Sequence, residues 1–294
     1  MSVIEMNHIT KDYGNQKGVF DVSFSVEKGE ILGFLGPNGA GKTTTIRQLM
    51  GFIKPDTGTV KINGMDCFKE VHKVQNILGY LPGEIAFMED MTGIDFIRFI
   101  ANMKNIKDVT KAKNLIQFLE LDPNGKIKKM SKGMKQKIGI VIALMQDPEI
   151  LILDEPTSGL DPLMQNKFVE LIQQEKKKGT TILMSSHIFE EVEHTCDRVV
   201  IIKDGSIKAI ERMEDLRNSR KKVYEIFFQD EKSALSFQQA HPSSVCHGSR
   251  IVISYQGSID PLLKELASYT IMDMTIRTQS LEELFLQYYG GEKQ

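Results

Sequence analysis

The spacing of apolar and polar positions changes along the chain and predicts four zones. In residues 1–85, short apolar runs are separated by turn signals. Glu30–Leu35 is typical of a buried strand, and Thr59–Ile62 alternates before Asn63 and Gly64. An Asn-Gly pair after an alternating run is a strong signal for a tight hairpin. This zone is therefore predicted to consist mainly of short strands.

Residues 86–146 change to the three- and four-residue spacing of amphipathic helices. Thr92 is placed to cap the first of them, and Thr110 is placed to cap the next. The apolar positions of the two helices are Ile94, Phe96, Ile97, Phe99, Ile100 and Met103, and then Leu115, Ile116 and Leu119. We expect a helical subdomain over about residues 86–146.

Residues 147–210 alternate between short apolar runs and helical segments. Strands are expected at Ile150–Leu153, Thr180–Ser185 and Arg198–Ile202, with a helix in each interval. Continuous apolar strands alternating with helices are typical of a buried, mostly parallel sheet. The predicted fold class is α/β, with a mixed, mostly parallel sheet, an antiparallel β subdomain and a helical subdomain.

The remainder of the chain, from about Asp215, is predicted to form a small α+β appendage. A charged stretch near Asp215 precedes a strand at Val223–Phe228, a helical segment, a strand around Ile251–Tyr255 and two further helices. Ser280 and Glu283 form a capping-box pattern for the last helix, which Gly290 is expected to end. We expect one domain over residues 1–214 and an accessory domain over residues 215–294.

Composition and charge exclude several classes of protein. The chain has 294 residues, 41% hydrophobic and 26% charged, with 37 Lys and Arg against 39 Asp and Glu. This balance excludes a polybasic nucleic-acid coat and an acidic tail protein. Three widely separated cysteines do not form a disulfide framework, which favours a cytoplasmic location. The N-terminus lacks the apolar core of a signal peptide, and the run Ile138–Gln146 is too short to span a membrane.

A glycine-rich segment supplies the first candidate chemistry. Gly36–Thr43 fits the pattern G-x-x-x-x-G-K-[ST] between an apolar strand and a helical run, the context that a phosphate-binding loop needs. Glycines let backbone N–H groups approach phosphates, and a helix N-terminus favours anions. The expected ATP-binding residues of this segment are Gly36, Asn38, Gly39, Ala40, Gly41, Lys42, Thr43 and Thr44.

Two carboxylates follow the strand Ile150–Leu153. Ligands bind beyond the carboxyl ends of parallel strands, so Asp154 and Glu155 are expected beside the phosphate loop. Asp154, with the Thr43 hydroxyl, is a candidate to hold Mg²⁺ partly through water. Glu155 is the candidate general base for the water that attacks the γ-phosphate.

Together these residues make the chain resemble the ATP-binding subunit of an ATP-binding-cassette (ABC) transporter over about residues 1–214. Four further matches occur in the family's order: Tyr13, Met130–Met134, Ser158–Asp161 and His187. The resemblance implies that Tyr13 stacks on adenine and that His187 acts near the γ-phosphate. It also implies that Asp161 links the two active sites and that three residues complete the partner's site: Ser131, Lys132 and Gly133.

Two segments depart from the family pattern. Lys132 replaces a glycine and Met134 a glutamine in the signature, and Gly83 stands where a glutamine is usual. Glu84 is therefore a further candidate for the Mg²⁺ site. These variants and the C-terminal appendage resemble the subgroup that powers export-type permeases, including drug- and antibiotic-efflux systems.

The resemblance implies an ATPase that uses ATP and Mg²⁺, forms an ATP-dependent homodimer and drives a separate membrane permease, at the inner face of the cell membrane. Residues 86–104 are candidates for receiving a permease helix, although core packing explains them equally well. One alternative is a soluble ABC-type ATPase acting on ribosomes or nucleic acid. Another is a regulatory protein that holds ATP without turnover. The six lysines of Lys126–Lys137 lack interleaved aromatics and favour a solvated face, so no nucleic-acid partner is expected.

Overall fold

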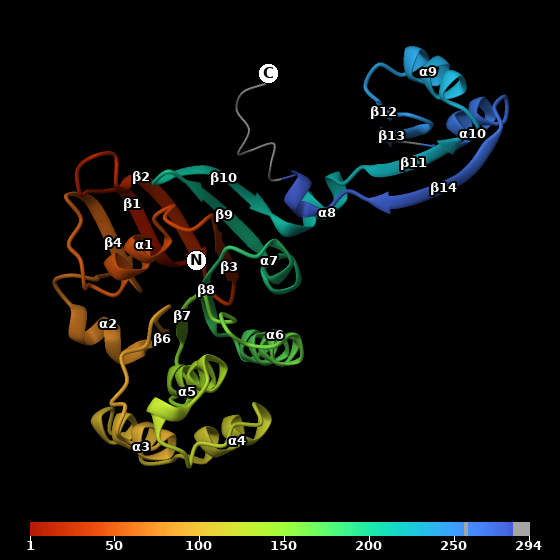
Figure 1. Cartoon of the computed structure of the whole chain (residues 1–294). Coiled ribbons are helices and arrows are strands. Elements are labelled where there is room, and N and C mark those ends of the chain that lie inside the picture. The colour runs from red at the N-terminus through yellow and green to blue at the C-terminus, as the bar shows by residue number, and fades with distance from the viewer. Residues whose placement is uncertain (256–257, 285–294) are drawn as a thin grey trace. The chain divides into compact units, whose positions relative to one another are not determined.

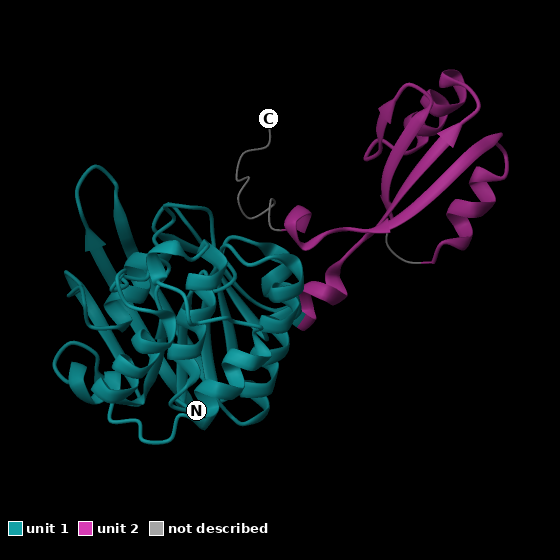
Figure 2. Cartoon of the chain, turned by 60° about the horizontal axis from the view of Figure 1, so that its bottom comes forward, with its two compact units in different colours: residues 1–213 teal, residues 214–294 magenta. Residues whose placement is uncertain are grey.

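The computed structural model describes residues 1–255 and 258–284 of the chain. The chain divides into two compact units, Met1–Met213 and Glu214–Gln294, shown in teal and magenta in Figure 2. Each unit has a hydrophobic cluster made from its own residues. The units are therefore described one at a time.

Unit 1 begins with an antiparallel sheet of order β2-β1-β4-β5. Its strands are β1 (Ser2–Asp12), β2 (Gly18–Glu27), β4 (Thr57–Ile62) and β5 (Met65–Asp66). Asn63 and Gly64, with φ of 49° and 76°, turn β4 into β5 so that Ile62 pairs with Met65. Two successive positive φ values are what a type I′ hairpin turn needs, which confirms the hairpin predicted from the Asn-Gly pair.

A six-stranded sheet of order β10-β9-β3-β8-β7-β6 forms the centre of unit 1. Its strands are β3 (Ile31–Leu35), β6 (Leu78–Leu81), β7 (Ile150–Asp154), β8 (Thr181–Ser186), β9 (Arg198–Lys203) and β10 (Ser206–Arg212). All pairs are parallel except β9 with β10. Every residue of β3, β7 and β8 is buried, which explains their continuous apolar runs and confirms the α/β class.

Helix α1 (Lys42–Leu49) begins directly after the glycine-rich loop and contacts both β4 and β7. Its Ile46 and Leu49 belong to the main hydrophobic cluster, which also contains residues of the antiparallel and central sheets. Helices α6 (Pro162–Lys177) and α7 (Phe189–Thr195) follow β7 and β8, as Figure 1 shows. This packing brings the loop before α1 and the ends of β7 and β8 to one edge of the sheet.

The predicted helical block is present as α3 (Gly93–Met103), α4 (Thr110–Phe118), a 3₁₀ turn at Ile127–Lys129 and α5 (Lys132–Leu144). A short helix, α2 (Val71–Ile77), precedes β6. The Thr92 side chain accepts from Asp95 N, so the predicted cap of α3 is confirmed. The cap predicted at Thr110 is wrong. Thr110 is the first helical residue, and its N–H donates to Asp108 Oδ1 at 2.9 Å.

Unit 2 holds an antiparallel sheet of order β12-β13-β11-β14. Its elements are β11 (Lys222–Phe228), α9 (Glu231–Ala240), β12 (Val245–His247), β13 (Arg250–Tyr255), α10 (Asp260–Leu266) and β14 (Ile271–Thr278), with α8 (Met213–Ser219) at the boundary. Tyr224, Ile226 and Phe228 pack against α9 and α10. Ser280 and Glu283 form the predicted capping box, with reciprocal bonds of 3.1 and 3.2 Å, while the expected end at Gly290 lies outside the described residues.

Among the residues that the structure describes, no helix is long and apolar enough to cross a membrane.

Candidate functional site

The glycine-rich loop forms a cradle at the start of α1. Gly39 and Gly41 have φ of 81° and 108°, a backbone region that residues with a side chain rarely adopt. Apart from the neighbouring residues of the loop, no atom in the described part of the chain lies within 4 Å of the position that a Cβ would take at Gly39. A Cβ at Gly41 would come within 2.6 Å of Val19 Cγ1. Among residues 1–255 and 258–284, no side chain caps α1. The first N–H groups of such a helix favour an anion, and phosphate binding here stays a prediction.

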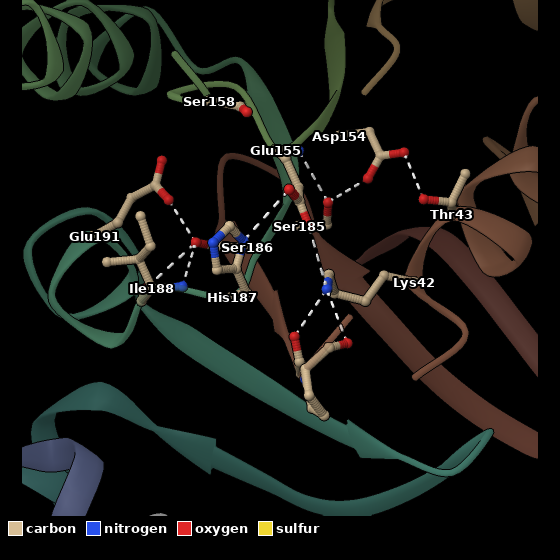
Figure 3. A network of polar contacts seen from close by, with 12 residues as sticks. Lys42, Thr43, Asp154, Glu155, Ser158, Ser185, Ser186, His187, Ile188 and Glu191 are labelled. Carbon is tan, nitrogen blue, oxygen red and sulfur yellow. Dashed lines mark hydrogen bonds and ion pairs between the residues drawn. The ribbon is translucent and has the colours of Figure 1, made fainter. Parts of the chain in front are cut away.

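Lys42 is buried under this loop. Its Nζ donates to Gly36 O at 2.8 Å and to Pro37 O at 3.2 Å, and it lies 3.3 Å from Glu155 Oε1 (Figure 3). A lysine ammonium has three donors. These neutral carbonyls and one carboxylate are partners that a phosphate oxygen could replace.

Asp154 ends β7 beside α1. Thr43 Oγ1 donates to Asp154 Oδ2 at 2.9 Å, and Ser185 Oγ donates to Asp154 Oδ1 at 2.5 Å. The carboxylate is buried. A carboxylate and a hydroxyl are hard oxygen donors of the kind that Mg²⁺ prefers, so this pair fits the ion in chemistry.

Glu155 is held in an unusual backbone conformation. Its φ is 48°, in the left-handed region, and its N–H donates to Ser185 O at 3.2 Å and to Ser185 Oγ at 3.0 Å. These contacts direct its carboxylate between two cations or potential cations. Oε1 faces Lys42 Nζ, and Oε2 lies 3.3 Å from His187 Nδ1. The structure thus brings together the two residues predicted to be catalytic, Glu155 and His187.

A cavity of about 650 Å³ joins the loop to the predicted adenine site. Its lining includes Tyr13, Asn38, Lys42, Thr43, Thr44 and Glu155. The Tyr13 ring is 54% exposed, and Lys11 Nζ lies 5.9 Å from its centroid. One cavity is therefore lined by the residues predicted to bind the adenine ring, to bind the phosphates and to activate the attacking water.

The signature segment lies elsewhere in the subunit, and the described lining of this cavity does not include it. Ser131 Oγ caps α5 by accepting from Met134 N at 3.2 Å. Lys132 Nζ donates to Ser158 Oγ at 2.8 Å, and a Cβ at Gly133 would come within 2.7 Å of Gly159 O. The signature therefore packs tightly against the Ser158–Asp161 segment.

Asp161 has the structural role that its sequence context predicts. Its Oδ1 accepts from Met164 N at 3.0 Å, and Pro162 follows as the first residue of α6. The cap fixes the end of the Ser158–Asp161 segment against a long helix.

The departure at Gly83 places backbone beside Asp154. A Cβ at Gly83 would lie 3.2 Å from Asp154 Oδ2, a contact tighter than most side chains make. Glu84 is exposed, so its proposed metal role remains a prediction. In the preceding strand, burial raises the pKa of Tyr80 to about 12, with the Asp154 charge adding to the effect.

Sequence reasoning missed two polar residues that support the site. Buried Gln136 of α5 donates to Pro156 O at 2.8 Å and to Glu155 O at 3.3 Å. Glu191 of α7 accepts from Ser186 Oγ at 2.5 Å. Gln136 lies in the helical block predicted over about residues 86–146, just before the apolar run Ile138–Gln146. A polar residue beside such a run was the available signal.

A mostly parallel sheet with a phosphate loop, a buried Asp154 and an adjacent Glu155 is typical of a P-loop nucleotide-hydrolysing protein. The ABC transporter family model matches residues 19–158. Bacitracin transport ATP-binding protein BcrA of Bacillus licheniformis is 34% identical, covering 99% of this chain and 98% of the relative. Linearmycin resistance ATP-binding protein LnrL of Bacillus subtilis is 38% identical, covering 73% and 70%.

A solved structure described as the ATP-binding subunit of an ABC transporter is similar, with a TM-score of 0.67 at 32% identity, covering 74% of this chain and 92% of that one. The chain belongs to the ABC transporter family as an ATP-binding subunit. It is an ATPase of this class, which confirms the resemblance inferred from its motifs.

Proposed function

We propose that two copies of this subunit enclose two Mg-ATP molecules, and that Glu155 is the general base for hydrolysis. The observation that carries this proposal is the Glu155 carboxylate, held between Lys42 and His187 at the edge of the loop cavity. In this arrangement the carboxylate is positioned to accept a proton from a water aimed at the γ-phosphate. His187 supports the same phosphate.

The loop residues would bind the triphosphate. Lys42 Nζ would exchange Gly36 O, Pro37 O and Glu155 for β- and γ-phosphate oxygens, which releases the Glu155 carboxylate for its role as base. Tyr13 would stack on adenine. Backbone N–H groups at the start of α1 would contact the phosphates from the segment Gly36–Thr44.

Thr43 and Asp154 would hold Mg²⁺, and Glu84 is a further candidate. The existing 2.9 Å hydrogen bond between Thr43 and Asp154 keeps two oxygen donors together at the cavity. When bound, Mg²⁺ neutralises developing charge on the phosphate oxygens. Ser185 keeps Asp154 oriented through the opposite carboxylate oxygen.

A second copy would complete each site. Ser131, Lys132 and Gly133 do not line the cavity of their own subunit within the described residues. They lie at the N-terminus of α5, a helix end that favours an anion. We assign them to the γ-phosphate bound by the partner, with Asp161 linking the two sites.

The partner outside this homodimer would be a separate membrane permease, with this subunit peripheral on its cytoplasmic side. Within residues 86–104, Phe96 and Ile97 are buried, so core packing accounts for them. Met88 and Met103 are 50% and 67% exposed and remain available for a permease helix. The names of the two relatives, which refer to bacitracin transport and linearmycin resistance, support export of an antibiotic. They do not favour the ribosomal or nucleic-acid alternative.

Glu155→Gln tests the catalytic proposal. The amide keeps the shape but is a far weaker base, so ATP turnover should fall by about 10²–10⁴-fold with ATP binding retained. Glu190→Gln, an exposed position on α7, is the matched control. Phosphate release at the wild-type rate in Glu155→Gln would contradict the proposal.

The transport proposal is tested in the host cell. Loss of the protein, or Glu155→Gln, should raise sensitivity to bacitracin or linearmycin, and affinity purification should recover a membrane protein. Recovery of ribosomes or RNA in its place would support the alternative class.

A further inference from the structure

Glu191 is a partly buried acidic residue for which the proposed hydrolysis step has no use. It lies on α7, four residues after His187, and Figure 3 shows it on the opposite side of Ser186 from Glu155. Its Oε1 is buried and has no hydrogen-bond partner in the described part of the chain. A buried carboxyl oxygen without a partner is costly, so a requirement other than stability is the natural reason for its presence.

The other oxygen of Glu191 holds the turn that presents His187. Ser186 Oγ donates to Glu191 Oε2 at 2.5 Å and accepts from Ile188 N at 2.9 Å. These two bonds bracket His187 from the residue before it and the residue after it. The histidine ring itself is about 43% exposed, so little packing fixes it from outside.

The same turn touches the phosphate loop. Ser186 O accepts from Gly36 N at 3.2 Å, and His187 Nδ1 reaches Glu155 Oε2 at 3.3 Å. A shift of Ser186 would therefore move His187 relative to both the loop and the proposed base.

Charge around Glu191 is mixed. Burial raises the pKa of Glu191, the negative charge of Glu155 acts in the same direction, and the hydrogen bond from Ser186 and the nearby His187 oppose it. The hydrogen bond from Ser186 needs only an acceptor oxygen, which both protonation states of the carboxyl retain.

We propose that Glu191 is a positioning residue for hydrolysis, which anchors Ser186 and so holds His187 against Glu155 and the phosphate loop. This inference rests on the proposed function, because it assigns Glu191 an effect only through His187. It predicts that the hydrogen-bond acceptor at position 191 matters and that its charge does not.

The test compares Glu191→Ala with Glu191→Gln in the full chain, with Glu190→Ala as the control. Glu191→Ala should lower kcat by about 10- to 100-fold, the range expected when a reacting group shifts by about 1 Å, with the dissociation constant for ATP unchanged. Glu191→Gln keeps an amide oxygen for Ser186 and should stay near the wild-type rate. Adding Glu191→Ala to His187→Ala should cause no further loss.

Four results would overturn the inference. The first three are a wild-type rate in Glu191→Ala, an equal loss in Glu191→Gln, and additive losses with His187→Ala. The fourth is weakened ATP binding in Glu191→Ala, because that indicates a general structural role. Failure of the proposed function is recognised separately, by unchanged hydrolysis in Glu155→Gln and His187→Ala.

Discussion

Glu155 adopts a left-handed backbone conformation that costs a non-glycine residue about 1–3 kcal/mol. Two sets of hydrogen bonds hold it in this conformation. The Glu155 N–H donates to Ser185, and the Glu155 carbonyl accepts from the Gln136 side chain. The same contacts turn its carboxylate toward Lys42 and His187. Strain at this position is therefore coupled to the geometry that the proposed reaction requires.

Lys42→Ala should weaken ATP binding by about 10- to 100-fold, because a hydrogen bond to a charged group contributes about 1.5–3 kcal/mol. Turnover should fall with it. Lys61→Ala, an exposed position on β4, is the control for loss of one positive charge. The measurements are isothermal titration with ATP and phosphate release. Full activity in Lys42→Ala would contradict the assignment of the loop.

At the scale of single residues, local sequence patterns predicted most of the residues of the candidate site. Gly36–Thr43 and the pair Asp154 and Glu155 lie in contiguous motifs, so their chemistry and approximate placement follow from the strand–loop–helix pattern. Gln136 and Glu191 could not be placed this way. Their partners, Pro156 and Ser186, depend on how α5 and α7 pack against strand ends.

Among the elements, those with a strong period or a clear cap were predictable. The apolar strands β3 and β7 and the capped helix α3 follow from single-sequence patterns. Strands β10 and β14 were not predicted, because all of their residues are partly buried or exposed and neither strand contains a continuous apolar run. Both lie at sheet edges, where burial selects the sequence least.

Helix α6 allows the two roles assigned to Asp161 to be separated. Asn caps a helix about as well as Asp, whereas Ala loses about 1 kcal/mol. Asp161→Ala should therefore lower the free energy of unfolding by about that amount, and Asp161→Asn should leave it nearly unchanged. Urea unfolding measures both.

The same two variants, Asp161→Ala and Asp161→Asn, test whether the charge at position 161 has a role in hydrolysis. If Asp161 also links two sites across a dimer, Asp161→Asn should reduce the cooperativity of hydrolysis with ATP concentration while stability is kept. Wild-type cooperativity in both variants would restrict Asp161 to capping.

At the scale of the whole molecule, the two hydrophobic clusters use different stretches of chain. One contains residues from Val3 to Ile202, and the other residues from Tyr224 to Leu266. We therefore propose that a chain ending at Met213 folds and binds ATP on its own. Circular dichroism and ATP titration would test this, and an insoluble or nucleotide-blind product would show that the units depend on each other.

The last prediction concerns two copies of the chain. If Ser131 and Gly133 complete the partner's site, the γ-phosphate bridges the loop of one copy and the α5 N-terminus of the other. Glu155→Gln with Mg-ATP should then accumulate as a dimer, because the bridge is no longer removed by hydrolysis. Its mass, measured by light scattering after gel filtration, should be about twice that with ADP.

Ser131→Arg in the Glu155→Gln background separates this shared site from dimerisation through unit 2. Arginine places bulk and charge at the end of α5 where the phosphate would dock, so the ATP-dependent dimer should disappear. Any dimer formed by unit 2 alone would persist with ADP and be unaffected by position 131. A Glu155→Gln protein that stays monomeric at saturating Mg-ATP would contradict a shared site in the isolated subunit, since hydrolysis is the step that removes the bridge and this variant lacks the base for it.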